Sequence, residues 1–367
     1  MSKKIIGWIT GSIVVLGISG YVLARYNTNS MAHVVYQRVM HTNKNSASSL
    51  KSGHSAAVVN DVTPKSKKQP SLLNQKEVQK ELIDKGYTGA YATVENGKIS
   101  PTSFVGKNAN QMNGKFYLAT NTENMLTAAA VLHLINQGKL RLSTPINQYF
   151  NSLAISNNVT VQTLLNMTSG LSNNSIPSNQ LANVLDWNVN HVHSGTVGQY
   201  NYQEVNYVLL EGIISQIANQ SYQEYINNTF LRPNGLLNDV KFVSQIDDNN
   251  LATPYNGGQP VANTDLAKAM NSQMGKNQLV TTPEGLLKLT KVLIKQYGND
   301  PNFSGSQPTG RLIKESNMYY VSGGIVGYQA SVAISQDSSK GVVLMSNDSN
   351  GKENLTSLVK DIYNKLK

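Results

Sequence analysis

The spacing of hydrophobic and polar positions changes along the chain, and each spacing predicts a different kind of segment. The first residues are apolar, whereas residues 26–75 are rich in Ser, Asn and Lys and show no period. Beyond residue 75 the pattern becomes that of a globular protein, with helical spacing in some segments and alternation in others. The chain therefore divides into an apolar start at 1–25, a polar stretch at 26–75 and a folded domain at 76–367.

Strands are predicted at both ends of the folded domain. Residues 88–100, TGAYATVENGKIS, alternate around Asn96-Gly97, a dipeptide typical of two-residue hairpin turns. Residues 327–335 alternate and residues 340–348 form an apolar run, with a turn sequence at Asp337–Gly341 between them. The sequence therefore predicts one hairpin near each end of the domain.

Helical spacing lies between these hairpins and on both sides of them. The predicted helices are Glu77–Lys85, 119–138, 159–171, Tyr207–Ile217, Tyr222–Phe230, Pro283–Tyr297 and Leu355–Leu366. Strands at both ends with helices between them indicate one α/β domain. Its sheet would be completed by both termini, and the central helices would form an insertion.

Residues 1–25 predict an N-terminal transmembrane helix. As a helix, the uncharged stretch Ile5–Ala24 spans about 30 Å, the thickness of a bilayer's hydrocarbon core. Lys3 and Lys4 precede it and favour a cytoplasmic N-terminus. A cleaved signal peptide is the alternative, because Val22–Ala24 weakly resembles a cleavage site. The folded domain is then extracellular in a single-pass cell-membrane protein, or it is secreted.

The net charge of +10 does not indicate nucleic-acid binding, because the positive charge is concentrated before the folded domain. Residues 1–25 carry +3 and residues 26–75 carry +5, which leaves +2 for residues 76–367. The composition of 26–75 predicts a disordered basic linker that is attracted to the membrane surface or to anionic wall polymer, or else a plain spacer. The chain has no cysteine, which excludes disulfides, thiolate zinc sites and a cysteine nucleophile.

Six segments of the folded domain occur in an order and spacing that resemble a known superfamily. They are GAYATVENGKI, LTAAAVLHLINQGKLRLSTPINQYF, VTVQTLLNMTSGLS, YQEVNYVLLEGIISQIANQSYQEYI, LVTTPEGLLKL and SGGIVGYQASVAIS. Together they resemble the serine β-lactamase and penicillin-binding-protein-like superfamily, nearest its class C and D-alanyl-D-alanine carboxypeptidase branch. The resemblance implies a β-lactamase/transpeptidase-like α/β fold, with an antiparallel sheet flanked by helices and a helical subdomain.

Members of this superfamily use three short motifs. In Ser-x-x-Lys the two residues share one face of a helix, so that the amine can take the proton of the hydroxyl. The N-terminus of that helix adds partial positive charge where an oxyanion develops. A Tyr-x-Asn motif helps to move protons, and a Lys/His-x-Gly motif lies on an edge strand.

The first motif is lost in this chain. The run TAAAVLHL sets the register, and it puts Asn121 at the serine position and Asn124 at the lysine position. A carboxamide is neither a useful nucleophile nor a base. The neighbours Thr120, Thr122 and Glu123 carry hydroxyl and carboxylate groups, but Thr120 and Glu123 also have the spacing of a capping box. We favour the capping interpretation.

The other two motifs are incomplete. Tyr202 matches the tyrosine of the second motif, but Glu204 replaces its asparagine. In the third motif Val321, Ser322 and Gly323 replace the basic residue, the variable residue and the glycine, so that only the glycine remains. Of the main chemical side chains of the superfamily, Tyr202 is the one retained.

Two further features are interpreted as structural. Ser169, in MTSGL, matches a loop that supports the site in relatives. His191 and His193 form His-x-His, which can bind a metal on a strand, but the sequence offers no evident third ligand. The sequence therefore predicts neither a metal site nor a cofactor.

The lost motifs predict a catalytically inactive relative that binds peptidoglycan-like or other peptide ligands at the cell surface. The predicted ligand-binding residues are Asn121, Asn124, Tyr202, Glu204, Ser322 and Gly323. One alternative is an active serine hydrolase, D,D-carboxypeptidase or esterase with a non-standard nucleophile. Another is a surface module that binds a protein partner and has no small-molecule site.

Overall fold

The computed structural model describes most of the predicted folded domain. The described residues are 73–106, 115–153, 155–173, 184–261, 278–307, 309, 311–349 and 354–367. They belong to one compact unit, Gln69–Lys367. The predicted membrane anchor, and the linker as far as residue 72, lie outside the described residues. No helix within the described ranges has both the length and the apolar character that a membrane crossing requires.

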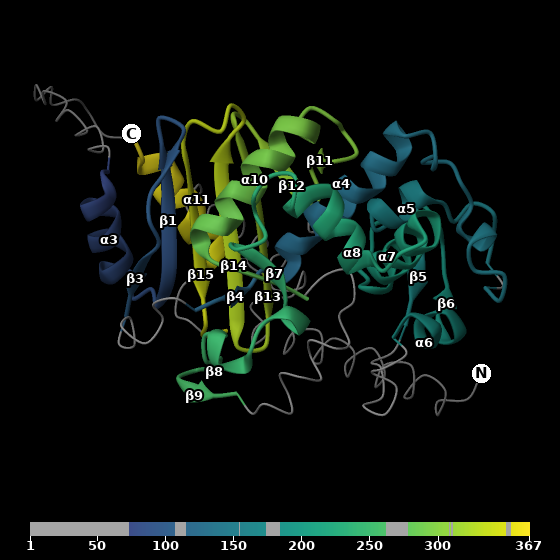
Figure 1. Ribbon diagram of the computed structural model, residues 1–367, viewed down its shortest axis with the longest axis horizontal. Coiled ribbons are helices and arrows are strands. Elements are labelled where there is room, and N and C mark those ends of the chain that lie inside the picture. The colour runs from purple at the N-terminus through teal and green to yellow at the C-terminus, as the bar shows by residue number, and fades with distance from the viewer. Residues whose placement is uncertain are drawn as a thin grey trace, which may run out of the picture. The chain divides into compact units, whose positions relative to one another are not determined.

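A large sheet forms one side of the domain (Figure 1). Within the described residues its strands follow the order β11-β12-β13-β14-β15-β1-β2, and β3 also pairs with β1. All the pairings are antiparallel except that of β11 with β12, which is parallel. The bounds are β1 Gly89–Glu95, β2 Lys98–Ile99, β3 Ser103–Val105, β11 Ser304–Gly305, β12 Leu312–Glu315, β13 Met318–Ile325, β14 Tyr328–Ser335 and β15 Gly341–Ser346.

Both predicted hairpins are confirmed. Strands β1 and β2 pair around a turn in which Asn96 and Gly97 have φ of 51° and 77°, the left-handed conformation that such a turn requires. Strands β14 and β15 form the second hairpin. Strand β1 then pairs with β15 from Ala90, opposite Met345, to Val94, opposite Gly341. The two ends of the domain therefore complete one sheet, as the sequence predicts.

The two faces of this sheet belong to different hydrophobic clusters. Ala90, Ala92 and Val94 of β1 belong to the large core, which also includes residues of the central helices. Tyr91, between them in sequence, belongs to a smaller cluster with residues of α3 and α11. Neighbouring side chains of a strand point to opposite faces, so this alternation shows that helices cover both faces of the sheet.

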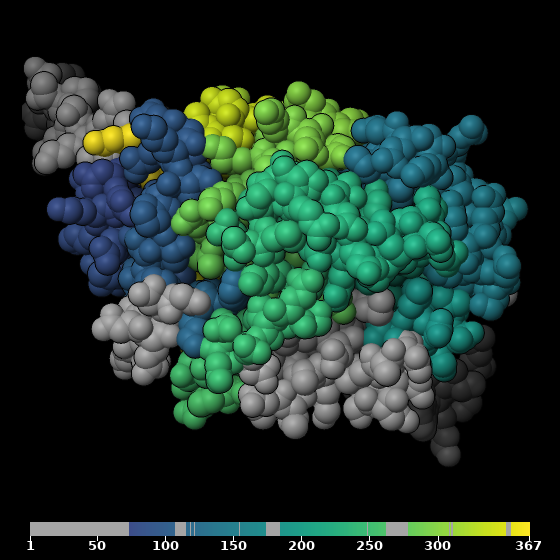
Figure 2. Space-filling model, in the orientation of Figure 1, coloured from purple at the N-terminus to yellow at the C-terminus, as the bar shows by residue number. Residues whose placement is uncertain are grey.

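The predicted helices are present, but the one predicted at 159–171 is limited to the five residues of α5, and α6 is a further helix that the sequence did not predict. The helix bounds are α3 Gln75–Asp84, α4 Glu123–Asn136, α5 Val161–Leu165, α6 Val184–His191, α7 Val205–Ala218, α8 Tyr222–Ile226, α10 Pro283–Tyr297 and α11 Leu355–Lys365. A π-helical turn, Asn227–Leu231, extends α8. Helix α7 packs against α4, α5, α6 and α8, and these helices form the helical subdomain. In Figure 2, which shows one face of the molecule, the purple surface of α3 lies at the left and the teal surface of the helical subdomain lies at the right.

Smaller sheets of short strands accompany the large one. In the described part of the chain, β4 (Tyr117–Leu118), β10 (Leu279–Thr281) and β7 (Val240–Phe242) form a three-stranded sheet. The other two pairs are β5 (Leu171–Ser172) with β6 (His193–Ser194) and β8 (Tyr255–Asn256) with β9 (Gln259–Pro260). The residues that follow β4 lead directly into α4.

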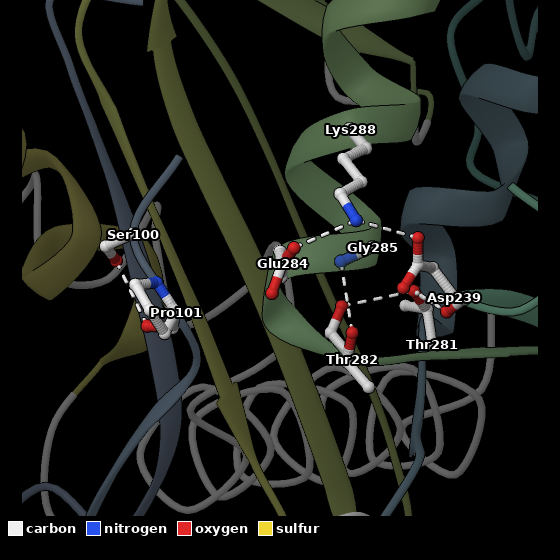
Figure 3. Close-up of polar contacts among 8 residues, drawn as sticks. All are labelled: Ser100, Pro101, Asp239, Thr281, Thr282, Glu284, Gly285 and Lys288. Atoms are coloured by element: carbon white, nitrogen blue, oxygen red, sulfur yellow. Dashed lines mark hydrogen bonds and ion pairs between the residues drawn. The ribbon is translucent and has the colours of Figure 1, made fainter. Parts of the chain in front are cut away.

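Polar contacts fix the start of α10 beside β7 and β10 (Figure 3). Thr282 is the N-cap of α10, and its hydroxyl accepts a hydrogen bond of 3.1 Å from the amide of Gly285. One turn further on, the ammonium of Lys288 lies 2.8 Å from a carboxylate oxygen of Glu284 and 2.9 Å from one of Asp239. Proline at the first helical position and a threonine cap explain why this helix begins where the sequence predicts.

Candidate functional site

Asn121, which the predicted register puts at the nucleophile position, lies in a tight turn before α4. Residues Thr120–Thr122 form a 3₁₀ turn, η2, and Glu123 is the first residue of α4. Thr120 has φ of 52°, a left-handed conformation that is uncommon for a β-branched residue, and it is fully buried. Such strain is typical of functional sites and must be maintained by the surrounding structure. The backbone of Asn121 belongs to this turn, and its side chain lies outside the described part of the structure.

The predicted capping box is wrong. The N-cap of α4 is Thr122, and it makes no side-chain capping bond. The carboxylate of Glu123 is buried, and its Oε2 accepts hydrogen bonds from the amides of Gln278 at 2.7 Å and Leu279 at 2.8 Å. Nothing in the local sequence predicts these bonds, because the partners are more than 150 residues away in the chain. Glu123 therefore ties the start of α4 to the start of β10.

Asn124, at the lysine position, is fully buried. Its Nδ2 donates a hydrogen bond of 3.1 Å to the carbonyl oxygen of Thr309, and its carboxamide also interacts with the phenol of Tyr202. No donor in the described part of the chain reaches its buried Oδ1. The structure therefore places Asn124 beside Tyr202, the two residues that the predicted register assigns to the first and second motifs.

Tyr202 lies in the loop immediately before α7. Tyr202 is partly buried as a residue and packs against the large core, and its hydroxyl oxygen is buried. Burial raises the pKa of Tyr202, the negative charge of Glu204 adds to the increase, and the interaction with Asn124 opposes it. The phenol is therefore protonated at neutral pH and serves as a neutral hydrogen-bonding group.

Glu204, which replaces the asparagine of the second motif, stands at the N-cap of α7. It is partly exposed and makes no side-chain capping bond there. Its charge acts on the phenol two residues earlier. Glu204 therefore adds a negative charge to the neighbourhood of Tyr202 and Asn124.

The third motif lies on β13, which packs beside η2. Val321 is 1% exposed and belongs to the large core. The hydroxyl of Ser322 forms a hydrogen bond with that of Ser331 on β14, and Gly323 is partly exposed. All three motif-equivalent segments thus converge where η2 meets α4, but at this end of β13 the basic side chain is replaced by an apolar one.

Among the described residues, one edge of β13 is unpaired along Val321–Ile325. Strand β14 pairs with all eight residues from Met318 to Ile325. On the other edge β12 pairs only with Met318, Tyr319 and Tyr320. No strand among the described residues pairs with that edge from Val321 to Ile325. Open strand edges are ready to accept another extended chain.

Thr309 and Arg311 are part of this region, although the sequence did not single them out. The buried guanidinium of Arg311 donates to Thr309 Oγ1 at 2.9 Å, to Asn166 Oδ1 at 2.8 Å and to the carbonyl oxygen of Asn302. Arg311 thereby fixes Thr309, whose carbonyl holds Asn124. No local sequence pattern marks these residues as part of the site, since Thr309 lies 185 residues after Asn124 in the chain.

Nearby aromatic and hydroxyl groups support the site from within. Burial raises the pKa of Tyr207 to about 12, although the positive charge of Arg311 opposes the increase. Ser169 donates a hydrogen bond of 2.6 Å to Asn206 in the first turn of α7, which agrees with its interpretation as structural.

His191, the first histidine of His-x-His, stacks on Trp187 at 4.5 Å between ring centroids. Within the described ranges, no group of three or more potential metal-ligating side chains is present.

A second buried carboxylate lies behind the site. Glu211, on α7, is 4% exposed, and no donor in the described residues reaches its Oε2. Burial raises the pKa of this carboxyl well above its usual range, and the charge of Glu123 raises it further. Glu211 is therefore protonated over a wider pH range in the folded protein than in the unfolded chain.

We expect Glu211→Gln to remove the loss of folding stability that the buried carboxyl of Glu211 causes as the pH rises. Because the pKa is raised by folding, the folded state holds the proton more tightly, and stability falls as the pH rises above the unfolded value near 4.5. The substituted side chain is a neutral amide and carries no titrating proton. At pH 8 the free energy of unfolding of the variant should therefore exceed that of the wild type by about 1–3 kcal/mol. The variant should accordingly unfold at a higher urea concentration. The difference should shrink toward pH 4.5, and a difference that does not depend on pH would contradict the assignment.

Comparison with known proteins agrees with this geometry. The sequence model of the Beta-lactamase family matches residues 125–361, more than half of the chain. The chain belongs to the beta-lactamase family. The matched residues of this family member begin immediately after Asn124 and include the second and third motif-equivalent segments.

Solved structures share the fold of this chain. FmtA from Staphylococcus aureus has a TM-score of 0.67 and 19% identity, with 81% of this chain and 90% of FmtA covered. The D-amino acid amidase from Ochrobactrum anthropi SV3 has a TM-score of 0.65 and 17% identity, with 78% and 95% covered. At such identities these likenesses show the fold alone, and they support the β-lactamase-like α/β architecture.

Two curated relatives are also similar in sequence. PbpX of Bacillus subtilis, named as a penicillin-binding protein, is 29% identical over 174 residues, which are 44% of this chain and 43% of PbpX. Protein flp of Staphylococcus aureus strain NCTC 8325 is 30% identical over 168 residues, 42% of this chain and 31% of flp. The chain thus spans less than half the length of the curated relatives it matches.

Proposed function

We propose that this family member binds an extended peptide, such as a peptidoglycan stem peptide, and does not cleave it. The single observation that carries the proposal is the open edge of β13 from Val321 to Ile325, beside η2. An extended peptide can add to such an edge through its backbone hydrogen bonds, while pockets beside the strand select its side chains.

The chemistry at the motif-equivalent positions supports binding without turnover. The neutral amide of Asn124 stands in the lysine position and is tied to Thr309. Two of the alternative catalytic groups are engaged, because the hydroxyl of Thr122 donates a hydrogen bond to the carbonyl of Ala119 and Glu123 accepts two backbone amides. The hydroxyl of Thr120 is buried and has no hydrogen-bond partner among the described residues. A general base must reach the proton of the nucleophile, and the hydrogen bonds of Glu123 direct it to β10 instead.

The proposed location is the outer surface of the cell membrane, with residues 1–25 as anchor and residues 26–75 as basic linker. The proposal rests on the uncharged stretch Ile5–Ala24 and on the positive charge around it. In this arrangement the domain would reach peptidoglycan outside the membrane, and the linker would be attracted to anionic lipid or wall polymer.

Hydrogen exchange measured with and without a soluble pentapeptide muropeptide tests the proposed binding. Amides that gain a backbone partner exchange more slowly, so we expect protection within Val321–Ile325 when the peptide is added. The same strand provides the control, because Met318–Tyr320 is already paired on both edges and should not change. Tyr202→Phe should weaken binding several-fold, since it removes one hydroxyl from the site.

Two results would contradict the proposal. The absence of any muropeptide binding would exclude peptide recognition of this kind. Binding that protects other segments but leaves Val321–Ile325 unchanged would place the ligand elsewhere. A protein partner that protects this edge when muropeptide does not would instead favour a protein-interaction module.

A further inference from the structure

A buried positive charge lies next to the candidate site without a negative partner. Arg311 is 4% exposed, and none of the ion pairs between described residues includes it. Its guanidinium donates to Thr309 Oγ1, to Asn166 Oδ1 and to the carbonyl oxygen of Asn302, and all three acceptors are neutral. Buried charges in proteins are ordinarily paired, because removing a charge from water is costly. The partner that Arg311 lacks is therefore negative.

The polar groups around Arg311 do not supply this negative charge. Asp300 directs its Oδ1 to the backbone amide and the side-chain amide of Asn302, at 2.8 and 2.9 Å, and forms no ion pair with Arg311 in the described part of the chain. The charge of Arg311 acts on Tyr207, but burial raises the pKa of that phenol to about 12, so it is neutral at pH 7. The C-cap of α5, Asn166, offers only the partial charge of a five-residue helix.

The guanidinium also retains hydrogen-bond donors. It carries five N–H groups, one on Nε and two on each of the other two nitrogens. Within the described ranges each nitrogen of Arg311 uses one N–H, so one on Nη1 and one on Nη2 have no acceptor. An anion that reaches these atoms gains charge-assisted hydrogen bonds, which are stronger than those to neutral acceptors.

A glycine leaves space beside one of these nitrogens. Gly305, in β11, is partly exposed, and the one atom beyond its chain neighbours that an added Cβ would approach is Arg311 Nη2, at 3.9 Å. The φ of Gly305 is not positive, so neither the backbone conformation nor the packing of described residues requires a glycine here. The absent side chain leaves a small space between Nη2 and the partly exposed strand β11.

We propose that Arg311 binds a small monovalent anion of the size of chloride, between its Nη2 and Gly305. One negative charge balances the guanidinium, and the near-complete burial of Arg311 favours a small ligand over a bulky one. The bound anion stabilises the loop of Thr309, whose carbonyl oxygen holds Asn124 Nδ2. This anion site does not depend on peptide binding at the edge of β13.

Thermal unfolding of the full-length protein at constant ionic strength tests the inference. The probe is chloride, which replaces the bulky anion gluconate while the sodium concentration stays fixed. A ligand that binds the folded state raises the melting temperature in a saturable manner. We expect a rise of about 3–5 °C at a chloride concentration about ten times the dissociation constant, which then levels off.

Three variants locate the effect. Arg311→Gln removes the positive charge and should abolish the saturable rise. Arg232→Gln removes an exposed arginine, which bonds to Asn228, and should respond to chloride as the wild type does. Gly305→Ala places a methyl group in the space beside Nη2 without a clash and should weaken the apparent affinity for chloride at least fivefold. Because it keeps Arg311, this variant decides the question even where Arg311→Gln does not fold.

Three results would overturn the anion site. The first is a wild-type melting temperature that does not change when chloride replaces gluconate. The second is a rise that does not saturate, because a general effect of the salt would then explain it. The third is a saturable rise that persists unchanged in folded Arg311→Gln or in Gly305→Ala, since the anion would then bind elsewhere.

Discussion

Incubation with a fluorescent penicillin is expected to leave the wild-type protein unlabelled. Covalent labelling needs a nucleophile whose proton is taken by a nearby base. The sequence places Asn121 at the nucleophile position, and the structure shows a buried amide, Asn124, held by Thr309 where the base would stand. A carboxamide cannot accept the proton of a hydroxyl at neutral pH. Gel fluorescence and intact-protein mass spectrometry would measure the label.

The control for this experiment is the same protein after heat denaturation, which reports non-specific attachment. A mass increase equal to one penicillin on the folded protein alone would contradict the expectation. Peptide mapping would then show which residue carries it, and Thr120 and Thr122 are the hydroxyl side chains to examine first. Thr120→Ala and Thr122→Ala would then distinguish the two, and loss of labelling in either would establish a non-standard nucleophile.

Glu123→Ala is expected to lower the free energy of unfolding by about 3–5 kcal/mol. The substitution leaves the amides of Gln278 and Leu279 without their acceptor, and each unsatisfied buried group costs about 1–3 kcal/mol. It also leaves a cavity beside the start of α4, because Glu123 is fully buried. For a domain of this size the melting temperature should fall by roughly 6–10 °C. Thermal and urea unfolding followed by circular dichroism would measure both quantities.

Two variants serve as controls for the effect of Glu123. Glu123→Gln retains a side-chain oxygen as acceptor and should be destabilised less than Glu123→Ala. Asp361→Ala removes an exposed carboxylate and should change stability by less than about 0.5 kcal/mol. If Glu123→Ala melted within about 1 °C of the wild type, the carboxylate would not be the tie between α4 and β10 that the structure shows.

Some of the strands and helices followed from local sequence, whereas α6 and the three-stranded sheet β4-β10-β7 were not predicted. Helix α10 begins and ends where its period and its proline predict, at Pro283 and Tyr297. The Asn96-Gly97 turn and the β14–β15 hairpin also follow from local chemistry, since a two-residue turn and an alternating pattern each need only neighbouring residues. These elements are specified by residues that lie within a few positions of one another.

The start of α4 shows where local interpretation fails. Thr120 and Glu123 satisfy the spacing of a capping box, and the sequence contained no sign of a competing partner for the carboxylate. In the folded chain, β10 brings the amides of Gln278 and Leu279 to Glu123, and they take the place of the local bond. Two backbone donors in a buried position outweigh one capping bond.

The sequence by itself determined the resemblance to the superfamily and, with it, the predicted register that puts the neutral residues Asn121, Asn124 and Val321 and the acidic Glu204 at motif positions. Only the tertiary structure decided which way Asn124 faces, because that depends on the carbonyl of Thr309 from a distant loop. It also decided that, among the described residues, no strand pairs with one edge of β13 beyond Tyr320, since strand pairing joins segments that are far apart in the chain. The identity of a side chain is a local property, whereas its partners and its exposure are set by the folding of the whole domain.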